Sequence, residues 1–181
     1  LAITNYAFGN HLFLPKELRA EEGRILSYWN DENWGNLVAK GKLDGHFSDQ
    51  LVAATKSMIE RWNTTPKPQW ITAVPSLNNV DLVESFARRL SDALEIPYHS
   101  AISKLQENEF QKKQENLYFQ FKNLVGVFGV EENVRKEPVF LIDDIVDSRA
   151  TVTVIAALLR ENGVENVFPV ALSTSNFKQD E

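Results

Sequence analysis

The sequence predicts an α/β fold built on a mostly parallel sheet with helices on both sides. From residue 66 onward, short runs rich in β-branched and aromatic residues alternate with amphipathic helical segments. That alternation is typical of parallel strands joined by helices. The run at residues 139–146 also begins with four consecutive apolar residues, as expected for a strand covered on both faces.

Residues 1–65 are predicted to form a helical hood in front of this core. Residues 16–29 carry acidic side chains first and apolar ones later, and they are predicted to be helical. Ser48 is a predicted N-cap. The helix after it is expected to run to about residue 62, because apolar and small side chains recur there with a period of about 3.6 residues.

Residues 66–181 are predicted to form the core. The expected strands are residues 69–74, a short run after 96–98, 124–130, 139–146 and 167–172. The helix at residues 80–94 is expected because Leu82, Phe86, Leu90 and Leu94 lie on one stripe. The helix at residues 151–162 is expected to end at Gly163, which can take the left-handed conformation just beyond a helix.

Composition narrows the class of protein. The 181 residues, 43% of them hydrophobic, suit one compact domain. A net charge of −6 argues against a protein that coats nucleic acid non-specifically. The absence of cysteine excludes a disulfide framework, a thiolate metal site and a cysteine nucleophile, and a cytoplasmic address fits it.

The ends and apolar runs of the chain add two expectations. No apolar run approaches the ~18 residues that a membrane helix needs, so no membrane partner is expected. The chain begins with Leu1 rather than Met, so we expect it to be a piece of a larger protein.

Two adjacent carboxylates carry the strongest chemical signal. Asp143 and Asp144 lie near the carboxyl end of a predicted buried strand, and a small polar turn at residues 147–151 then opens a helix. Ligands of open α/β sheets bind outside such strand ends. A turn at a helix N-terminus, with the hydroxyls of Ser148 and Thr151, suits a phosphate. The carboxylates suit vicinal hydroxyls or hydrated Mg²⁺, so the segment predicts a site for a phosphorylated sugar.

A purely structural role for this segment is the alternative. In that interpretation the two acids end the strand and Ser148 is an ordinary N-cap. The acids extend an otherwise apolar strand, whereas solvated turn residues are expected later in the chain, and this favours a ligand site.

The segment at residues 139–151 resembles the phosphoribosyl pyrophosphate (PRPP) motif of type I phosphoribosyltransferases: an apolar strand, two acids, two apolar residues and a hydroxyl-rich loop. Four segments together, GRILSYWNDENWG, KLDGHFSDQL, VPSLNN and DDIVDSRAT, are similar to a narrower, ComF-like group. That group is the phosphoribosyltransferase-like domain fused to RecQ-type ATP-dependent DNA helicases. The resemblance covers roughly residues 15–173.

The resemblance implies the type I phosphoribosyltransferase fold and a role for each matching residue. Asp143 and Asp144 are implied to be catalytic, to meet the ribose hydroxyls and to hold Mg²⁺, the implied cofactor, through water or substrate. The implied 5-phosphate loop consists of Asp147, Ser148, Arg149, Ala150 and Thr151. The implied pyrophosphate loop consists of Pro75, Ser76 and Leu77. The implied flexible loop contains Lys104, Gln111 and Lys112.

The implied activity is transfer of a phosphoribosyl group to or from a nitrogenous base, a glycosyltransferase reaction. The implied partners are PRPP, a base or nucleotide, and the helicase domains of the same longer chain, with a role in DNA repair. No direct binding of nucleic acid is expected. The sequence leaves both a homodimer and a monomer as alternatives, and it does not identify the base.

Two departures from the family pattern leave the activity open. Arg149 stands where most members have glycine, and residues 76–79 lack the basic side chain that many members use. The alternative is a non-catalytic module that senses PRPP or nucleotides, or that docks the helicase to partners. Binding of single-stranded DNA is a third hypothesis, and the net charge counts against it.

Overall fold

A parallel sheet forms the centre of the molecule. The computed structural model describes residues 14–75, 81–105, 124, 126–147 and 149–175. Across the sheet the strands lie in the order β1 (Arg24–Tyr28), β6 (Val167–Thr174), β5 (Val139–Val146) and β2 (Trp70–Ala73). All three neighbouring pairs are parallel, which confirms the predicted fold class.

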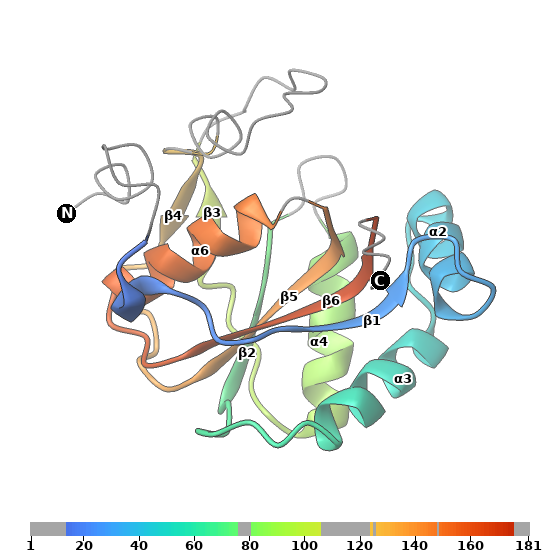
Figure 1. Ribbon diagram of the computed structural model, residues 1–181, viewed down its shortest axis with the longest axis horizontal. Helices are drawn as coiled ribbons and strands as arrows, with labels where there is room; N and C mark the ends of the chain where they lie inside the picture. Colours follow the sequence, from blue (N-terminus) through green and yellow to red (C-terminus); the bar gives the residue numbers. More distant parts are fainter. Residues whose placement is uncertain (1–13, 76–80, 106–123, 125, 148, 176–181) are drawn as a thin grey trace, which may run out of the picture.

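Helices cover both faces of the sheet (Figure 1). The helix α6 (Ala150–Glu161) packs on one face. The helices α3 (Asp49–Glu60) and α4 (Leu82–Leu94) pack on the other, and α2 (Trp34–Asp44) lies beside the end of β1. In the described part of the chain, no helix combines the length and the apolar character that crossing a bilayer requires.

Both faces of β5 are buried, which explains why polar and apolar residues do not alternate along its first half. Val139 and Leu141 belong to the core beneath α6, and Phe140 and Ile142 belong to the core beneath α3 and α4. Successive side chains of a strand point to opposite faces, and both faces here are buried. The predicted bounds of this strand, residues 139–146, agree with the structure.

A two-stranded antiparallel ribbon lies apart from the main sheet. It consists of β3 (Ile102–Lys104) and β4 (Phe128–Val130). Ile102 and Phe128 anchor it in the core on the α6 side. The segment that joins the two strands includes most of the predicted flexible loop.

The prediction of a helix at residues 16–29 is wrong. Only Lys16–Leu18 forms a short 3₁₀ turn, η1, and Arg24–Tyr28 is the strand β1. Among the described residues β1 pairs only with β6, as an edge strand does. Its exposed Ile25 and Tyr28 interrupt the alternation of buried and exposed side chains that would indicate a strand. The buried Ser27 hydroxyl donates to the Leu172 carbonyl at 2.8 Å, so partners far away in sequence decide this element. The predicted domain division at residue 65 remains a prediction.

The other predicted helices and strands agree with the structure to within about two residues, except the strand predicted at residues 124–130. There Leu124 is helical, Gly126 lies in a turn with φ of 74°, and the strand β4 begins at Phe128. The helices α2 and α3 confirm a helical N-terminal region, and α3 begins after Ser48 as predicted. The Ser48 hydroxyl is buried and has no hydrogen-bond partner among the described residues, so its side chain does not act as the cap. Gly163 follows α6 with φ of 88°, as its predicted position requires.

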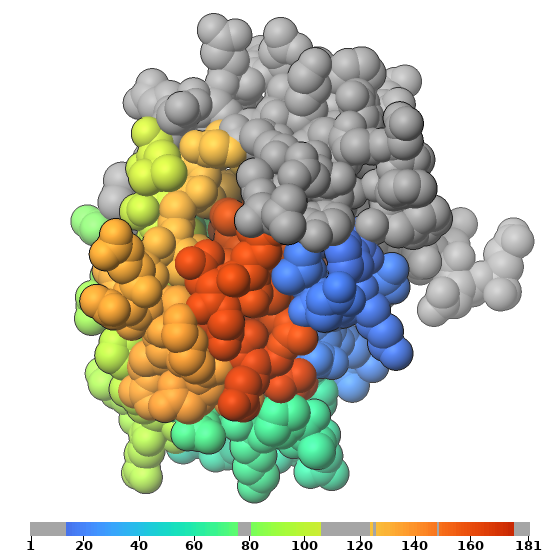
Figure 2. Space-filling view, turned by 90° about the vertical axis from the view of Figure 1, so that its left-hand side faces the viewer, coloured from blue at the N-terminus to red at the C-terminus, as the bar shows by residue number. Residues whose placement is uncertain are grey.

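The N-terminal segment, residues 14–23, packs against the α6 side of the core. Figure 2 shows this segment, in blue, beside the red-orange residues of α6. The Arg160 guanidinium of α6 donates to the Glu17 carbonyl at 2.7 Å, and the Asn166 amide donates to the Glu21 carboxylate at 2.7 Å. These bonds hold η1 and the chain before β1 against the core.

Candidate functional site

The carboxyl ends of the parallel strands meet at one edge of the sheet, where ligands of such folds bind. The Val74 N–H donates to the Ile142 carbonyl at 2.8 Å, so Pro75 leaves β2 beside the acid pair. The Ser175 hydroxyl, just after β6, donates to the Asp147 carboxylate at 2.6 Å. The structure therefore brings Pro75, the acid pair and Asp147 to the same edge.

The acid pair lies where β5 loses one of its neighbours. The strand β2 ends at Ala73, opposite Ile142, so beyond that point β5 pairs, within the described ranges, with β6 alone. The Asp143 carboxylate accepts the Asp144 N–H at 2.8 Å, and the Asp144 carboxylate accepts the Ile145 N–H at 2.6 Å. Buried backbone donors need partners, and the Asp143 carboxylate supplies one for the Asp144 N–H just beyond the end of β2.

The electrostatics of the two acids differ. Lys42 Nζ lies 2.9 Å from Asp144 Oδ2, and the Asp144 side chain is only 11% exposed. Burial, followed by the charge of Asp144, raises the pKa of Asp143 to about 7, although the Asp144 N–H and Lys42 oppose the rise. One carboxylate of the pair thus has a lysine partner, and the other has a raised pKa. Shifted pKa values of this kind are frequent at functional sites.

The loop after β5 leads into α6. The Arg149 carbonyl accepts the Thr153 N–H at 2.9 Å and its hydroxyl at 2.8 Å. Ala150 is buried, and Thr151 lies in the first turn of the helix. The first N–H groups of a helix lack partners within it, and together with the helix dipole they favour an anion. The loop and helix start can therefore bind a phosphate.

Arg149 occupies this loop in a left-handed conformation, with φ of 63° and ψ of −1°. Such a conformation is costly for a residue with a Cβ and free of that cost for glycine. The resemblance leads one to expect glycine at position 149. The left-handed backbone there gives a reason for that expectation, besides close approach to a phosphate.

Arg149→Gly is expected to raise the free energy of unfolding by about 0.5–1 kcal/mol, because it removes the strain of the positive φ. Urea denaturation measures this difference. The matched control is Arg149→Ala, which removes the guanidinium but keeps the Cβ, and it should give no gain. Equal stabilities of the two variants would show that the backbone conformation is not the cause.

The remaining predicted site residues divide into two groups. Lys104 ends β3 and is half-buried, at the start of the predicted flexible loop. The others lie outside the described residues: Ser76, Leu77, Gln111, Lys112 and Ser148.

The acid pair offers few of the oxygen ligands that Mg²⁺ needs. In the described part of the chain, no three His, Asp or Glu side chains gather into a group that could hold a metal ion alone. Mg²⁺ in proteins commonly binds through one or two carboxylates together with substrate phosphates. The acid pair fits an ion that arrives with a phosphate ligand.

Sequence reasoning missed Lys42. No local pattern marks it, because it belongs to α2 and reaches the acid pair only through the docking of that helix beside β1. Its ion pair is the clearest functional feature that the tertiary structure adds.

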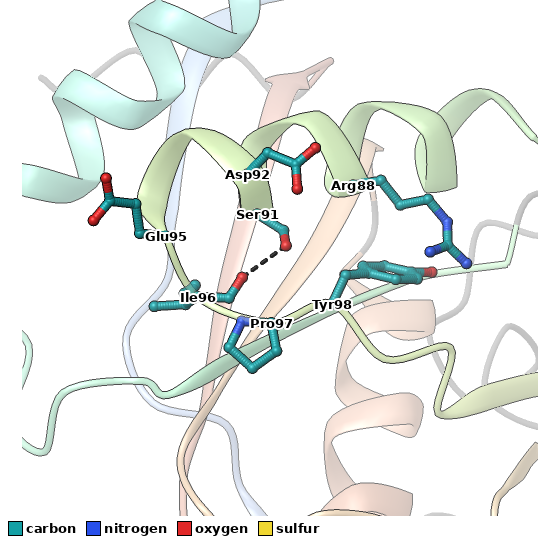
Figure 3. Close-up of a pocket in the computed structure, with 7 residues that line it drawn as sticks. All are labelled: Arg88, Ser91, Asp92, Glu95, Ile96, Pro97 and Tyr98. Atoms are coloured by element: carbon teal, nitrogen blue, oxygen red, sulfur yellow. Dashed lines mark hydrogen bonds between the residues drawn. The ribbon is translucent and has the colours of Figure 1, made fainter.

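A separate groove lies along the carboxyl-terminal half of α4 (Figure 3). Its volume is about 570 Å³, and it is lined by Arg88, Ser91, Asp92, Glu95, Ile96, Pro97 and Tyr98. The Arg88 guanidinium lies over the Tyr98 ring, 4.4 Å from its centre. Burial raises the pKa of Tyr98 to about 12, so its phenol stays protonated at neutral pH. Of the predicted site residues that the structure describes, none lines this groove.

Comparison with solved structures defines the class of fold. A crystal structure of adenine phosphoribosyltransferase matches with a TM-score of 0.50 and 17% identity, over 70% of this chain and 68% of that one. Together with the parallel sheet that helices flank on both faces, this match shows that the chain has the type I phosphoribosyltransferase fold.

Two longer proteins are also similar to the chain. It is 27% identical over 123 residues to ribose-phosphate pyrophosphokinase of Porphyromonas gingivalis (strain ATCC BAA-308 / W83). These aligned residues cover 68% of this chain and 34% of the relative. The allosteric regulatory enzyme of purine biosynthesis matches with a TM-score of 0.46 and 19% identity, over 67% of this chain and 25% of that one. The chain thus spans about a third of the first protein and a quarter of the second. No model of a known protein family matches it.

Proposed function

We propose that the chain binds PRPP together with Mg²⁺ at the carboxyl edge of the sheet and transfers the phosphoribosyl group to or from a nitrogenous base. The observation that carries this proposal is the acid pair near the carboxyl end of β5, followed two residues later by the loop that opens α6. The hydroxyls and the 5-phosphate of PRPP are joined by one ribose ring. They therefore require hydroxyl acceptors and an anion site within a few residues of each other, as this segment provides.

Each part of the edge has a role in this proposal. Asp143 and Asp144 accept hydrogen bonds from the ribose hydroxyls, and residues 147–151 surround the 5-phosphate with backbone N–H groups. Residues 75–77 lie next to the pyrophosphate. The resemblance supports a role for the segment after Lys104 in excluding the water that would otherwise hydrolyse PRPP.

The proposed reaction is a displacement at the anomeric carbon of the ribose. In the direction of nucleotide synthesis, the bond from this carbon to the pyrophosphate oxygen breaks, and the pyrophosphate takes the electron pair. A bond forms to a nitrogen of the base, and the proton of that nitrogen passes to the solvent. The carboxylates stabilise the positive charge that develops on the ribose. Bound Mg²⁺ supplies charge neutralisation of the departing pyrophosphate.

Calorimetric titration with PRPP and Mg²⁺ tests the proposal. The wild-type protein should bind, and Asp143→Asn/Asp144→Asn should bind at least about tenfold more weakly, because the neutral amides are poorer acceptors for the hydroxyls. The matched control is Asp92→Asn, which removes an exposed carboxylate of the α4 groove and should bind like the wild type. Absence of binding heat in the wild type would contradict the proposal.

A non-catalytic module that senses PRPP or nucleotides is the second candidate. The observation that favours it is Arg149, whose side chain and left-handed backbone stand where the fold requires close approach to a phosphate. Pyrophosphate release measured with a panel of bases separates the two candidates. Release no greater than in the double variant would favour the sensor, and Arg149→Gly should change the PRPP affinity in either case.

The wider setting of the domain is part of the proposal. The sequence resemblance supports fusion to a RecQ-type DNA helicase, a role in DNA repair and a cytoplasmic location. A homodimer is compatible with this proposal. The net charge of −6 favours a domain that serves the helicase without gripping DNA. Salt-dependent DNA binding tighter than about micromolar would contradict that part.

A further inference from the structure

Lys42 is the basic residue that the structure brings to the acid pair. Its Nζ lies 2.9 Å from Asp144 Oδ2, with side-chain exposures of 40% for Lys42 and 11% for Asp144. The other oxygen of Asp144, Oδ1, accepts the Ile145 N–H. Both oxygens of this buried carboxylate therefore have partners within the protein.

The position of Lys42 is set by close packing of α2. A Cβ on Gly35, in the first turn, would lie 2.0 Å from the Tyr28 carbonyl oxygen, and a Cβ on Gly41, beside Lys42, would lie 2.5 Å from the Phe47 ring. Val38, between them, is fully buried. Because α2 is held closely at both ends, Lys42 reaches Asp144 from a rigid helix rather than from a loop.

The ion pair changes what the acid pair can bind. Asp143 hydrogen-bonds to the Asp144 N–H and, within the described ranges of the chain, forms no ion pair of its own. A divalent cation needs carboxylate oxygens with free lone pairs, and Mg²⁺ dehydrates reluctantly. Lys42 and the Ile145 N–H already occupy the two oxygens of Asp144.

We propose that Lys42 is a further residue of the ligand site and acts as the internal counter-ion of Asp144. The free protein then does not bind a divalent cation at the acid pair, and the cation reaches the site only in a complex with the phosphates of the ligand. The identity of that ligand rests on the proposed function, but the exclusion of the free cation does not.

Titration of the protein with Mn²⁺ alone, followed by the electron paramagnetic resonance signal of the free ion at about pH 8, tests this inference. That pH lies above the raised pKa of Asp143, which is about 7. The wild type should show no saturable binding below about 1 mM, whereas Lys42→Met should bind at least about fivefold more tightly. The matched control is Lys40→Met, which removes an exposed lysine of the same helix that pairs with Asp44, and it should behave like the wild type.

Two further variants identify the cause of any gain. Lys42→Arg keeps the positive charge and should still exclude Mn²⁺, and adding Asp144→Asn to Lys42→Met should abolish the gained binding. Circular dichroism and thermal melting check that each variant is folded. Saturable Mn²⁺ binding by the wild type below about 1 mM, or a folded Lys42→Met without a gain, would overturn the inference.

The experiment separates this inference from the proposed function because it contains no PRPP. Failure of PRPP to bind, with the Mn²⁺ gain of Lys42→Met intact, would remove the proposed ligand and leave the counter-ion role. Normal PRPP binding without that gain would remove the counter-ion role alone.

Discussion

Asp143→Asn is expected to stabilise the free protein by about 2 kcal/mol at about pH 8. Burial and the neighbouring Asp144 raise the pKa of Asp143 to about 7, so ionising this carboxyl group costs more in the folded chain than in the unfolded one. The Asn side chain keeps an oxygen that can accept the Asp144 N–H, which Asp143 now accepts at 2.8 Å. The variant removes the charge and retains the hydrogen bond.

The pH dependence gives the sign of this effect. Because its pKa is raised, Asp143 binds a proton more tightly in the folded state. Its contribution to stability is therefore fully present below about pH 4 and is lost as the pH rises to about 7. The gain from Asp143→Asn should be close to zero at about pH 4 and largest at about pH 8, as measured by urea denaturation at several pH values.

The control for this prediction is Asp92→Asn, which changes an exposed carboxylate on α4 and should show no such pH-dependent gain. An Asp143→Asn protein that is less stable than the wild type at about pH 8 would show that the ionised carboxylate holds the fold together. A stabilised variant that also binds PRPP less well would show that the charge serves binding at the expense of stability.

Gly35→Ala is expected to lower the free energy of unfolding by about 3 kcal/mol. A Cβ at this position would lie 2.0 Å from the Tyr28 carbonyl oxygen and 3.0 Å from the Asn30 nitrogen. Both are backbone atoms at the end of β1, so no side-chain rotation relieves the clash. The Gly35 N–H also donates to the Asp31 carboxylate at 2.8 Å, and a shifted helix would lose this bond.

Asn36→Ala is the matched control, because Asn36 is the next residue of α2 and is exposed. It should change stability by no more than about 0.5 kcal/mol. Urea denaturation of both variants measures the difference, and a Gly35→Ala protein as stable as the wild type would contradict the prediction. Since Lys42 is carried by the same helix, a folded Gly35→Ala protein should also bind Mn²⁺ more tightly than the wild type.

Local sequence pattern was sufficient for the elements whose environment is uniform along their length. The strand β5 is buried on both faces, so its apolar run predicts both its type and its bounds. The helix α4 has one stripe of apolar side chains, and its predicted range differs from the structure only at its first residues. In both cases the hydrophobic effect acts on side chains that are neighbours in sequence, so the pattern is visible in the chain itself.

The strand β1 shows where local pattern fails. Its five residues have an irregular burial pattern, because an edge strand covers only part of the core. Its conformation is decided by backbone hydrogen bonds to β6 near the opposite end of the chain. A helix and an edge strand bury similar side chains there, and the segment alone does not distinguish them.

The sequence by itself determined the α/β class, the position of the acid pair at a strand end and the helix that follows it, because each depends on residues close together in the chain. The tertiary structure alone decided the strand order, the left-handed backbone of Arg149 and the approach of Lys42 to Asp144. It also decided how the two acids differ, since the pKa of Asp143 depends on burial by distant segments. Contacts between residues far apart in sequence leave no local pattern, and in this protein they set the charge of the site.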